Sequence, residues 1–341
     1  MMHMLESIGI AWVDGKITSM EEARIPFLDR GYFFGDGVYE AVKVIEGKLF
    51  ALEEHLERFE RSMKEIRITP PKTKAEFTDI IRECIEKAGI PNAMVYLQVT
   101  RGVGPRMHAF LPQGEPMVTL FVAPMDSLEE SVRVAGVSCI TVPDERWAHP
   151  HIKTLNLLPN VLAKQAAAEK GAFEAIFVLG TGPSGGLVTE ASSSNIAAVI
   201  NGKVVTPPLN GRILPGVSRA IMLETARAAG IEVEEREITL EELRSADEVI
   251  LTSTGVEVLG VCQLDGVTVG QGVAGPLTRR LYEVFMAGSV QRLSSLPATP
   301  MARDEMNVDT FNTIMQNGLD EAKADHSRLV TEVFVDLKRG L

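Results

Sequence analysis

The chain is punctuated by tight-turn dipeptides that stand between short apolar runs. Asp14-Gly15, Asn201-Gly202 and Asp265-Gly266 are of the Asn-Gly or Asp-Gly type, and Glu46-Gly47 is a less typical example. Such dipeptides favour the two-residue turns that join antiparallel strands. Helical patterns lie among these hairpins without the regular strand–helix alternation that builds a doubly wound parallel sheet. The sequence therefore predicts an α+β fold.

Two helices are predicted early in the chain, at residues 52–66 and from Thr73 to Gly89. In the first, apolar residues recur every three or four positions; in the second, Thr73 and Glu76 have the spacing of a capping box. The predicted division is a small α/β domain at 1–125, a polar linker at 126–131, a larger domain at 132–286 and a C-terminal extension at 287–341, whose residues 308–340 have an amphipathic helical pattern.

Composition limits the kinds of partner that this protein is expected to have. The net charge of −12 argues against general affinity for nucleic acid or an anionic membrane. Cys84, Cys139 and Cys262 are widely spaced within apolar runs, which predicts buried free thiols and neither a disulfide nor a metal site. Residues 1–12 lack Lys and Arg, and no apolar run reaches the length of a membrane span. We expect a cytoplasmic protein.

Lys153 is the first candidate for chemistry. An apolar approach leads to it, and a helical pattern follows through Val161 and Leu162, with Gly171 as a plausible cap. Desolvation at such a strand-to-helix junction would lower the pKa of the lysine and free its amine for Schiff-base chemistry. By itself the stretch is more typical of a lysine that extends to the surface.

Four further features change that balance. Glu190 is followed by three serines and an asparagine; Pro215 to Ser218 opens a helix; Thr252 to Gly255 follows an apolar strand; and Arg58 adjoins an apolar helix stripe. Each alone has an ordinary structural interpretation, as a turn, a cap or a surface residue. Together with Lys153 they supply a lysine, an acid, two phosphate-binding turns and a cation, which are the groups that pyridoxal phosphate requires. The glycines at 31–37 match no nucleotide-binding motif.

From Phe27 to about Gly288 the chain resembles the class IV, fold-type IV pyridoxal-phosphate aminotransferases. The resemblance rests on the stretches 31–40, 54–58, 153–156, 189–195 and 214–219. It implies a small α/β domain and a larger pseudo-barrel domain with the cofactor between them. It also implies that Lys153 forms the Schiff base and moves the substrate proton, and that Glu190 stabilises the protonated ring. The other implied cofactor contacts are Arg58, Val217, Ser218 and Thr254 at the phosphate, Leu214 against the ring, and Ser194 and Asn195; Tyr32 is implied to line the site near the lysine.

Within this class the chain looks most like the D-amino-acid transaminases. They carry an Arg-x-His pair that captures the substrate carboxylate, and this pair falls on Arg106 and His108. The resemblance implies ping-pong transfer from D-alanine or D-glutamate to pyruvate or 2-oxoglutarate. It also implies a homodimer in which this loop reaches the neighbouring site. Gly255-Val256 departs from the hydroxyl-rich pattern of that group. An R-selective amine transaminase and a branched-chain aminotransferase stay open, and an aminodeoxychorismate lyase or a non-catalytic binding role fits less well.

Overall fold

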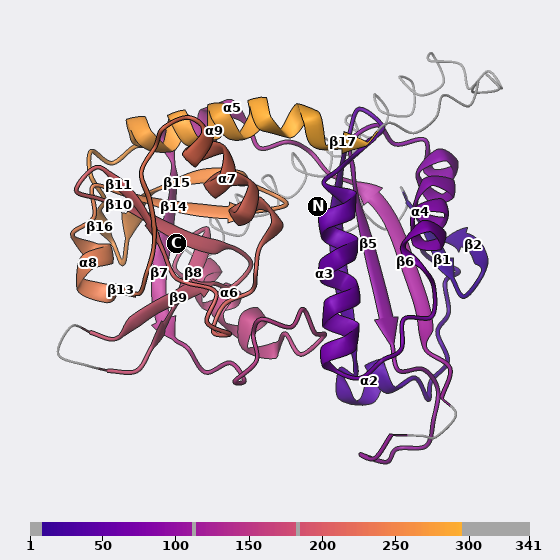
Figure 1. Cartoon of the computed structure of the whole chain (residues 1–341). Helices are drawn as coiled ribbons and strands as arrows, with labels where there is room; N and C mark the ends of the chain where they lie inside the picture. Colours follow the sequence, from indigo (N-terminus) through magenta and orange to yellow (C-terminus); the bar gives the residue numbers. More distant parts are fainter. Residues whose placement is uncertain (1–8, 111–113, 182–184, 295–341) are drawn as a thin grey trace, which may run out of the picture. The chain divides into compact units, whose positions relative to one another are not determined.

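Two β-sheets organise the chain in the computed structural model, which describes residues 9–110, 114–181 and 185–294 (Figure 1). The first sheet has seven strands, and every neighbouring pair is antiparallel. In spatial order these strands are β17 (Leu293–Ser294), β4 (Lys48–Phe50), β3 (Gly37–Ile45), β5 (Ala93–Thr100), β6 (Met117–Pro124), β1 (Ile10–Val13) and β2 (Lys16–Ser19).

Helices α3 (Leu52–Glu65) and α4 (Lys74–Ala88) pack against the first sheet (Figure 1). Their apolar stripes enter its core, where Phe59 and Phe77 are fully buried. The predicted capping box is present: the Glu76 amide donates to the Thr73 hydroxyl, and the Thr73 amide donates to the Glu76 carboxylate. The predictions for both helices are confirmed.

The second sheet has ten strands and mixes parallel with antiparallel pairs. In spatial order they are β12 (Val233–Glu235), β11 (Lys203–Thr206), β10 (Asn195–Ile200), β14 (Glu248–Ser253), β15 (Glu257–Leu264), β7 (Val137–Pro143), β8 (Glu174–Leu179), β9 (Leu187–Ala191) and β13 (Ile238–Thr239), with β16 (Val267–Thr268) paired to β15. Asn201 and Gly202 both have positive φ, of 53° and 76°, as the predicted hairpin turn requires. This mixture of hairpins and crossovers confirms the α+β prediction.

Helices cover the second sheet. They are α5 (Glu130–Ala135), α6 (Leu158–Glu169), α7 (Val217–Ala228), α8 (Leu240–Arg244) and α9 (Pro276–Ser289), followed by the short 3₁₀ helix η1 (Val290–Arg292). α7 and α9 pack on each other and on β14 and β15. Phe50, the last residue of β4 in the first sheet, and the adjacent Ala51 share a buried cluster with Ile221 of α7 and Phe285 of α9. The two sheets are therefore joined by a common core.

Some local expectations differ from the structure. α5 begins at Glu130, inside the predicted linker at 126–131. Residues 287–294 extend α9 to Ser289 and add β17 to the first sheet, so they do not separate from the body of the chain. The helical pattern at 308–340 lies outside the described residues.

Within the described ranges, no helix is long and apolar enough to cross a membrane. No cluster of three His, Cys, Asp or Glu side chains in the same ranges could hold a metal ion. The three cysteines are free thiols; Cys84 and Cys139 are buried, and Cys262 is half-buried. The prediction of free thiols is thus confirmed, and the prediction of burial is confirmed for Cys84 and Cys139.

Candidate active site

A cavity of about 710 Å³ gathers the predicted cofactor residues. Its walls come from β3, α3, the segment between β7 and α6, the turn between β9 and β10, the start of α7 and the turn between β14 and β15. The predicted residues that line it are Lys153, Glu190, Arg58, Leu214, Val217, Ser218, Thr254, Ser194 and Asn195. Residues from widely separated stretches of sequence therefore meet in one place, as the resemblance implied.

Lys153 lies on a segment that is hydrogen-bonded along β3. The Tyr39 amide donates to the Lys153 carbonyl at 3.0 Å, and the Leu155 amide donates to the Gly37 carbonyl at 3.1 Å. The predicted strand-to-helix junction is wrong in detail, because β7 ends at Pro143 and α6 begins only at Leu158. The Lys153 ammonium lies 4.2 Å from the centroid of the Tyr39 ring. This aromatic neighbour was missed by the sequence analysis.

The glycine-rich stretch before β3 seats the lysine segment. Gly35 ends the short helix α2 (Arg30–Phe34) with φ of 62°, a conformation that favours glycine. A Cβ at this position would lie 2.7 Å from the Asn156 side-chain oxygen, while the Asn156 amide donates to the Gly35 carbonyl at 3.1 Å. The glycine-rich stretch thus closely approaches the segment that carries Lys153.

Glu190 is a buried carboxylate at one end of the cavity. It accepts hydrogen bonds from the Asn195 side-chain amide at 2.9 Å and from the Leu214 backbone amide at 3.0 Å, and it forms an ion pair with Arg146. Burial raises the pKa of Glu190 to about 7, against the opposing charge of Arg146. A protonated pyridine nitrogen would add a second positive charge and favour the carboxylate form. Arg146, also held by Asp144 at 2.8 Å, was not predicted, because only the folded chain brings it to Glu190.

The part of the cavity lined by the start of α7 suits a phosphate. Gly216 is the N-cap of α7, and no side chain of the described residues caps the free amides of its first turn. A Cβ at Gly216 would lie only 2.0 Å from the Asn195 side-chain oxygen, so the turn needs glycine. Ser218 is buried beside it, and Thr254 comes from the neighbouring turn. The buried Thr252 hydroxyl lines the same wall without a hydrogen-bond partner among the described residues. These groups fit a phosphate monoester.

Arg58 enters the cavity from α3 and is held by a buried carboxylate. Its Nε donates to Glu40 Oε1 at 2.7 Å, and its Nη2 donates to Glu40 Oε2 at 2.8 Å. His55 Nδ1 lies 2.8 Å from the same carboxylate. Burial alone would raise the pKa of Glu40, but Arg58 and His55 hold it well below its usual range. A third bond, from Arg58 Nη1 to the Pro215 carbonyl at 3.1 Å, aims the guanidinium at the start of α7.

The predicted substrate residues do not line the cavity of their own chain. Tyr32 is 64% exposed, and Tyr39 occupies the place beside the lysine that the resemblance implied for Tyr32. Arg106 and His108 are also exposed, but they lie together. The Arg106 guanidinium is 5.6 Å and the His108 ring 5.5 Å from the centroid of the Phe34 ring. The Arg-x-His pair is therefore assembled on one aromatic support.

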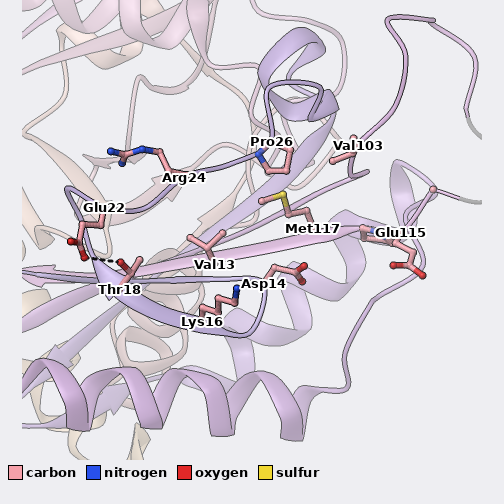
Figure 2. A pocket seen from close by; sticks show the side chains of 12 residues that line it. Val13, Asp14, Lys16, Thr18, Glu22, Arg24, Pro26, Val103, Glu115 and Met117 are labelled. Carbon is pink, nitrogen blue, oxygen red and sulfur yellow. Dashed lines mark hydrogen bonds between the residues drawn. The ribbon is translucent and has the colours of Figure 1, made fainter.

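A second hollow, of about 1080 Å³, lies apart from this site beside β1 and β2. Figure 2 shows its lining side chains, with the Thr18 hydroxyl directed at the Glu22 carboxylate. Its charged residues are of both signs, and none of the predicted site residues lines it. The predicted cofactor residues thus line the first cavity and not this hollow.

The fold and this cavity define a pyridoxal-phosphate-dependent aminotransferase, and the chain belongs to the family described as amino-transferase class IV, whose model matches residues 37–264. The D-alanine aminotransferase of Staphylococcus haemolyticus is 41% identical over 279 residues, which cover 80% of this chain and 95% of the relative. That of Bacillus licheniformis is 40% identical over 268 residues, covering 79% and 93%. A solved structure of the T.th. branched-chain amino acid aminotransferase with pyridoxamine 5′-phosphate is 27% identical, with a TM-score of 0.77 over 84% of this chain and 98% of that one.

Proposed function

We propose that the enzyme transfers the amino group of D-amino acids, such as D-alanine or D-glutamate, to 2-oxo acids such as pyruvate or 2-oxoglutarate. The observation that carries this proposal is the 41% identity to a D-alanine aminotransferase along nearly the whole of that relative. The solved branched-chain aminotransferase with pyridoxamine 5′-phosphate is more distant, at 27% identity, and so supports the branched-chain alternative less strongly. In this proposal Arg106 and His108, which lie beside one aromatic ring, bind the substrate carboxylate.

Different residues of the cavity have different roles in this reaction. When bound, pyridoxal phosphate supplies an electrophilic carbonyl carbon and an electron-accepting ring. Lys153 is the nucleophile that holds it and, once released, the base that moves the proton at the substrate Cα. Glu190 keeps a negative charge beside the ring nitrogen, and Arg146 and Asn195 orient that carboxylate. Arg58 and the start of α7 hold the phosphate end.

The carboxylate-binding pair is proposed to serve a second copy of the chain. Large apolar side chains are exposed near it, including Tyr32 and Met107 at 64% and 52%. Others are exposed on α6 near the cavity mouth, where Val161 and Leu162 are 58% and 62% exposed. Clusters of exposed apolar side chains mark interaction surfaces. A homodimer would cover the exposed apolar side chains near the loop and those on α6, and it would bring Arg106 of one chain to the cavity of the other. A cytoplasmic location and the domain boundaries at 125 and 132 stay predictions.

The test compares substrates with and without a carboxylate. D-Alanine, L-leucine, (R)-1-phenylethylamine and aminodeoxychorismate are assayed with wild-type enzyme and with Arg106→Ala. The variant should lose about 2–5 kcal/mol of transition-state binding for D-alanine, the scale for breaking a desolvated charge pair. Its activity toward the amine should fall much less. A wild-type preference for L-leucine, or an equal loss on both substrates, would contradict the proposal.

A further inference from the structure

The loop at residues 102–110 exposes its side chains but is anchored through its main chain. One guanidinium makes the anchor: Arg30 Nη1 donates to the Met107 carbonyl at 2.5 Å and to the Ala109 carbonyl at 3.5 Å, and Nη2 donates to the His108 carbonyl at 3.3 Å. Three successive carbonyls around His108 are thereby bound by one side chain. Arg30 itself is only 3% exposed, so this fork is part of the protein interior and not a surface contact.

A carboxylate fixes the direction of this fork. Asp36 Oδ2 accepts from Arg30 Nε at 2.8 Å and from Arg101 Nε at 2.9 Å. Arg101 donates onward to the carbonyls of Ile66 and Arg67, at 2.7 and 3.0 Å, where α3 ends. The chain of contacts therefore runs from the loop through Arg30, Asp36 and Arg101 to the end of a packed helix. Buried charges arranged in this way are costly unless every partner is in place.

Aromatic rings complete the anchor. The Arg101 guanidinium lies 3.7 Å from the centroid of the Phe110 ring, so it also holds the loop beyond the Arg30 contacts. The Arg30 guanidinium lies 4.9 Å from the centroid of the Phe34 ring, the same ring that supports Arg106 and His108. Arg30 thus contacts both the main chain of the loop and the Phe34 ring against which Arg106 and His108 lie.

We propose that Arg30 and Asp36 are positioning residues that hold Arg106 and His108 in register for the substrate carboxylate. The inference rests on the proposed function, which gives Arg106 and His108 that role. A guanidinium can bind several acceptors in fixed directions, whereas a lysine ammonium provides charge without the planar fork. Small displacements of a positioned ionic group cost much of its effect on a bound substrate.

The test uses the holoenzyme with Arg30→Lys and with Asp36→Asn, the second of which keeps the size of the side chain. Arg279→Lys is the matched control, because the exposed Arg279 also donates to a main-chain carbonyl, that of Ala274, but from α9 on the second sheet. Hydrogen exchange of the amides at 102–110 should become faster in both test variants only. The KM for D-alanine should rise between about tenfold and 100-fold with a smaller change in kcat. D-Alaninamide, which lacks the carboxylate, should be affected little.

Each outcome decides between the anchor and the carboxylate assignment. Unchanged exchange at 102–110 overturns the anchor, and so does an equal rise in KM for D-alanine and D-alaninamide. The positioning role is also overturned if exchange becomes faster in Arg30→Lys but the KM for D-alanine rises only in Arg106→Ala. If exchange becomes faster in Arg30→Lys but neither Arg30→Lys nor Arg106→Ala changes the kinetics with D-alanine, the role of Arg106 in the proposed function is overturned, while the anchor of the loop stands.

Discussion

Replacing Glu40 with glutamine should destabilise the protein far more than breaking a surface ion pair of the same length. Glu40 is completely buried and binds Arg58 through both carboxylate oxygens, with 2.7 Å between the first pair of atoms. Glu60 and Lys64 are also 2.7 Å apart, but their side chains are 35% and 64% exposed. Glu60→Gln is therefore a control that breaks an ion pair of the same length on the surface of the protein.

The expected magnitude follows from what each variant leaves behind. In Glu40→Gln the Arg58 charge stays buried with the Pro215 carbonyl as an uncharged partner, and His55 also loses its carboxylate. Removing one partner of a buried pair costs about 3–5 kcal/mol of unfolding free energy. Glu60→Gln exposes Lys64 to water that already solvates it, so its cost should be at most about 1 kcal/mol.

Urea unfolding of the cofactor-free enzyme, with linear extrapolation, measures the loss of unfolding free energy in Glu40→Gln and in Glu60→Gln. Because the folded pKa of Glu40 is held below its usual range, its contribution is present above the unfolded pKa and is lost as the pH falls through the folded pKa. The difference in unfolding free energy between wild type and Glu40→Gln should therefore be constant from about pH 6 to pH 8 and become smaller only in acid. A loss no larger than that of Glu60→Gln would refute the reasoning.

Four further outcomes are expected. Lys153→Ala should abolish turnover, and borohydride reduction with peptide mapping should label Lys153 in the wild type; a label on another lysine would overturn the site. Glu190→Gln should keep the cofactor but slow turnover on the order of 10²-fold, and unchanged turnover would show that Glu190 does not serve the ring nitrogen. In the cofactor-free protein the raised pKa of Glu190 makes stability fall as pH rises from 4.5 toward 7, since the unfolded chain releases that proton first, and Glu190→Gln should remove this component of the urea-unfolding profile. Val161→Asp with Leu162→Asp should shift sedimentation toward monomer and lose D-alanine turnover; an active, strictly monomeric wild type would contradict the shared site.

Local structure could be predicted from the sequence because its causes lie within a few residues. The turn at Asn201-Gly202 and the capping box of Thr73 and Glu76 depend on backbone φ angles and hydrogen bonds between near neighbours. The same holds for the candidate cofactor residues, since a helix start or a post-strand turn presents amides wherever it occurs. Their assembly in one cavity required the resemblance, because no local pattern states which turns will meet.

The partners of these residues were decided by tertiary structure. The buried charge of Glu40 within an apolar strand is a signal that a partner must exist, since lone charges are rarely buried, but the strand does not say that Arg58 supplies it. Successive side chains of a strand point to opposite faces, so Tyr39 can face Lys153 while Glu40 faces α3. Which face meets which element depends on sheet register and helix packing over the whole chain. The sequence alone therefore determined the local elements and their chemical groups, whereas packing at long range decided which group stabilises which.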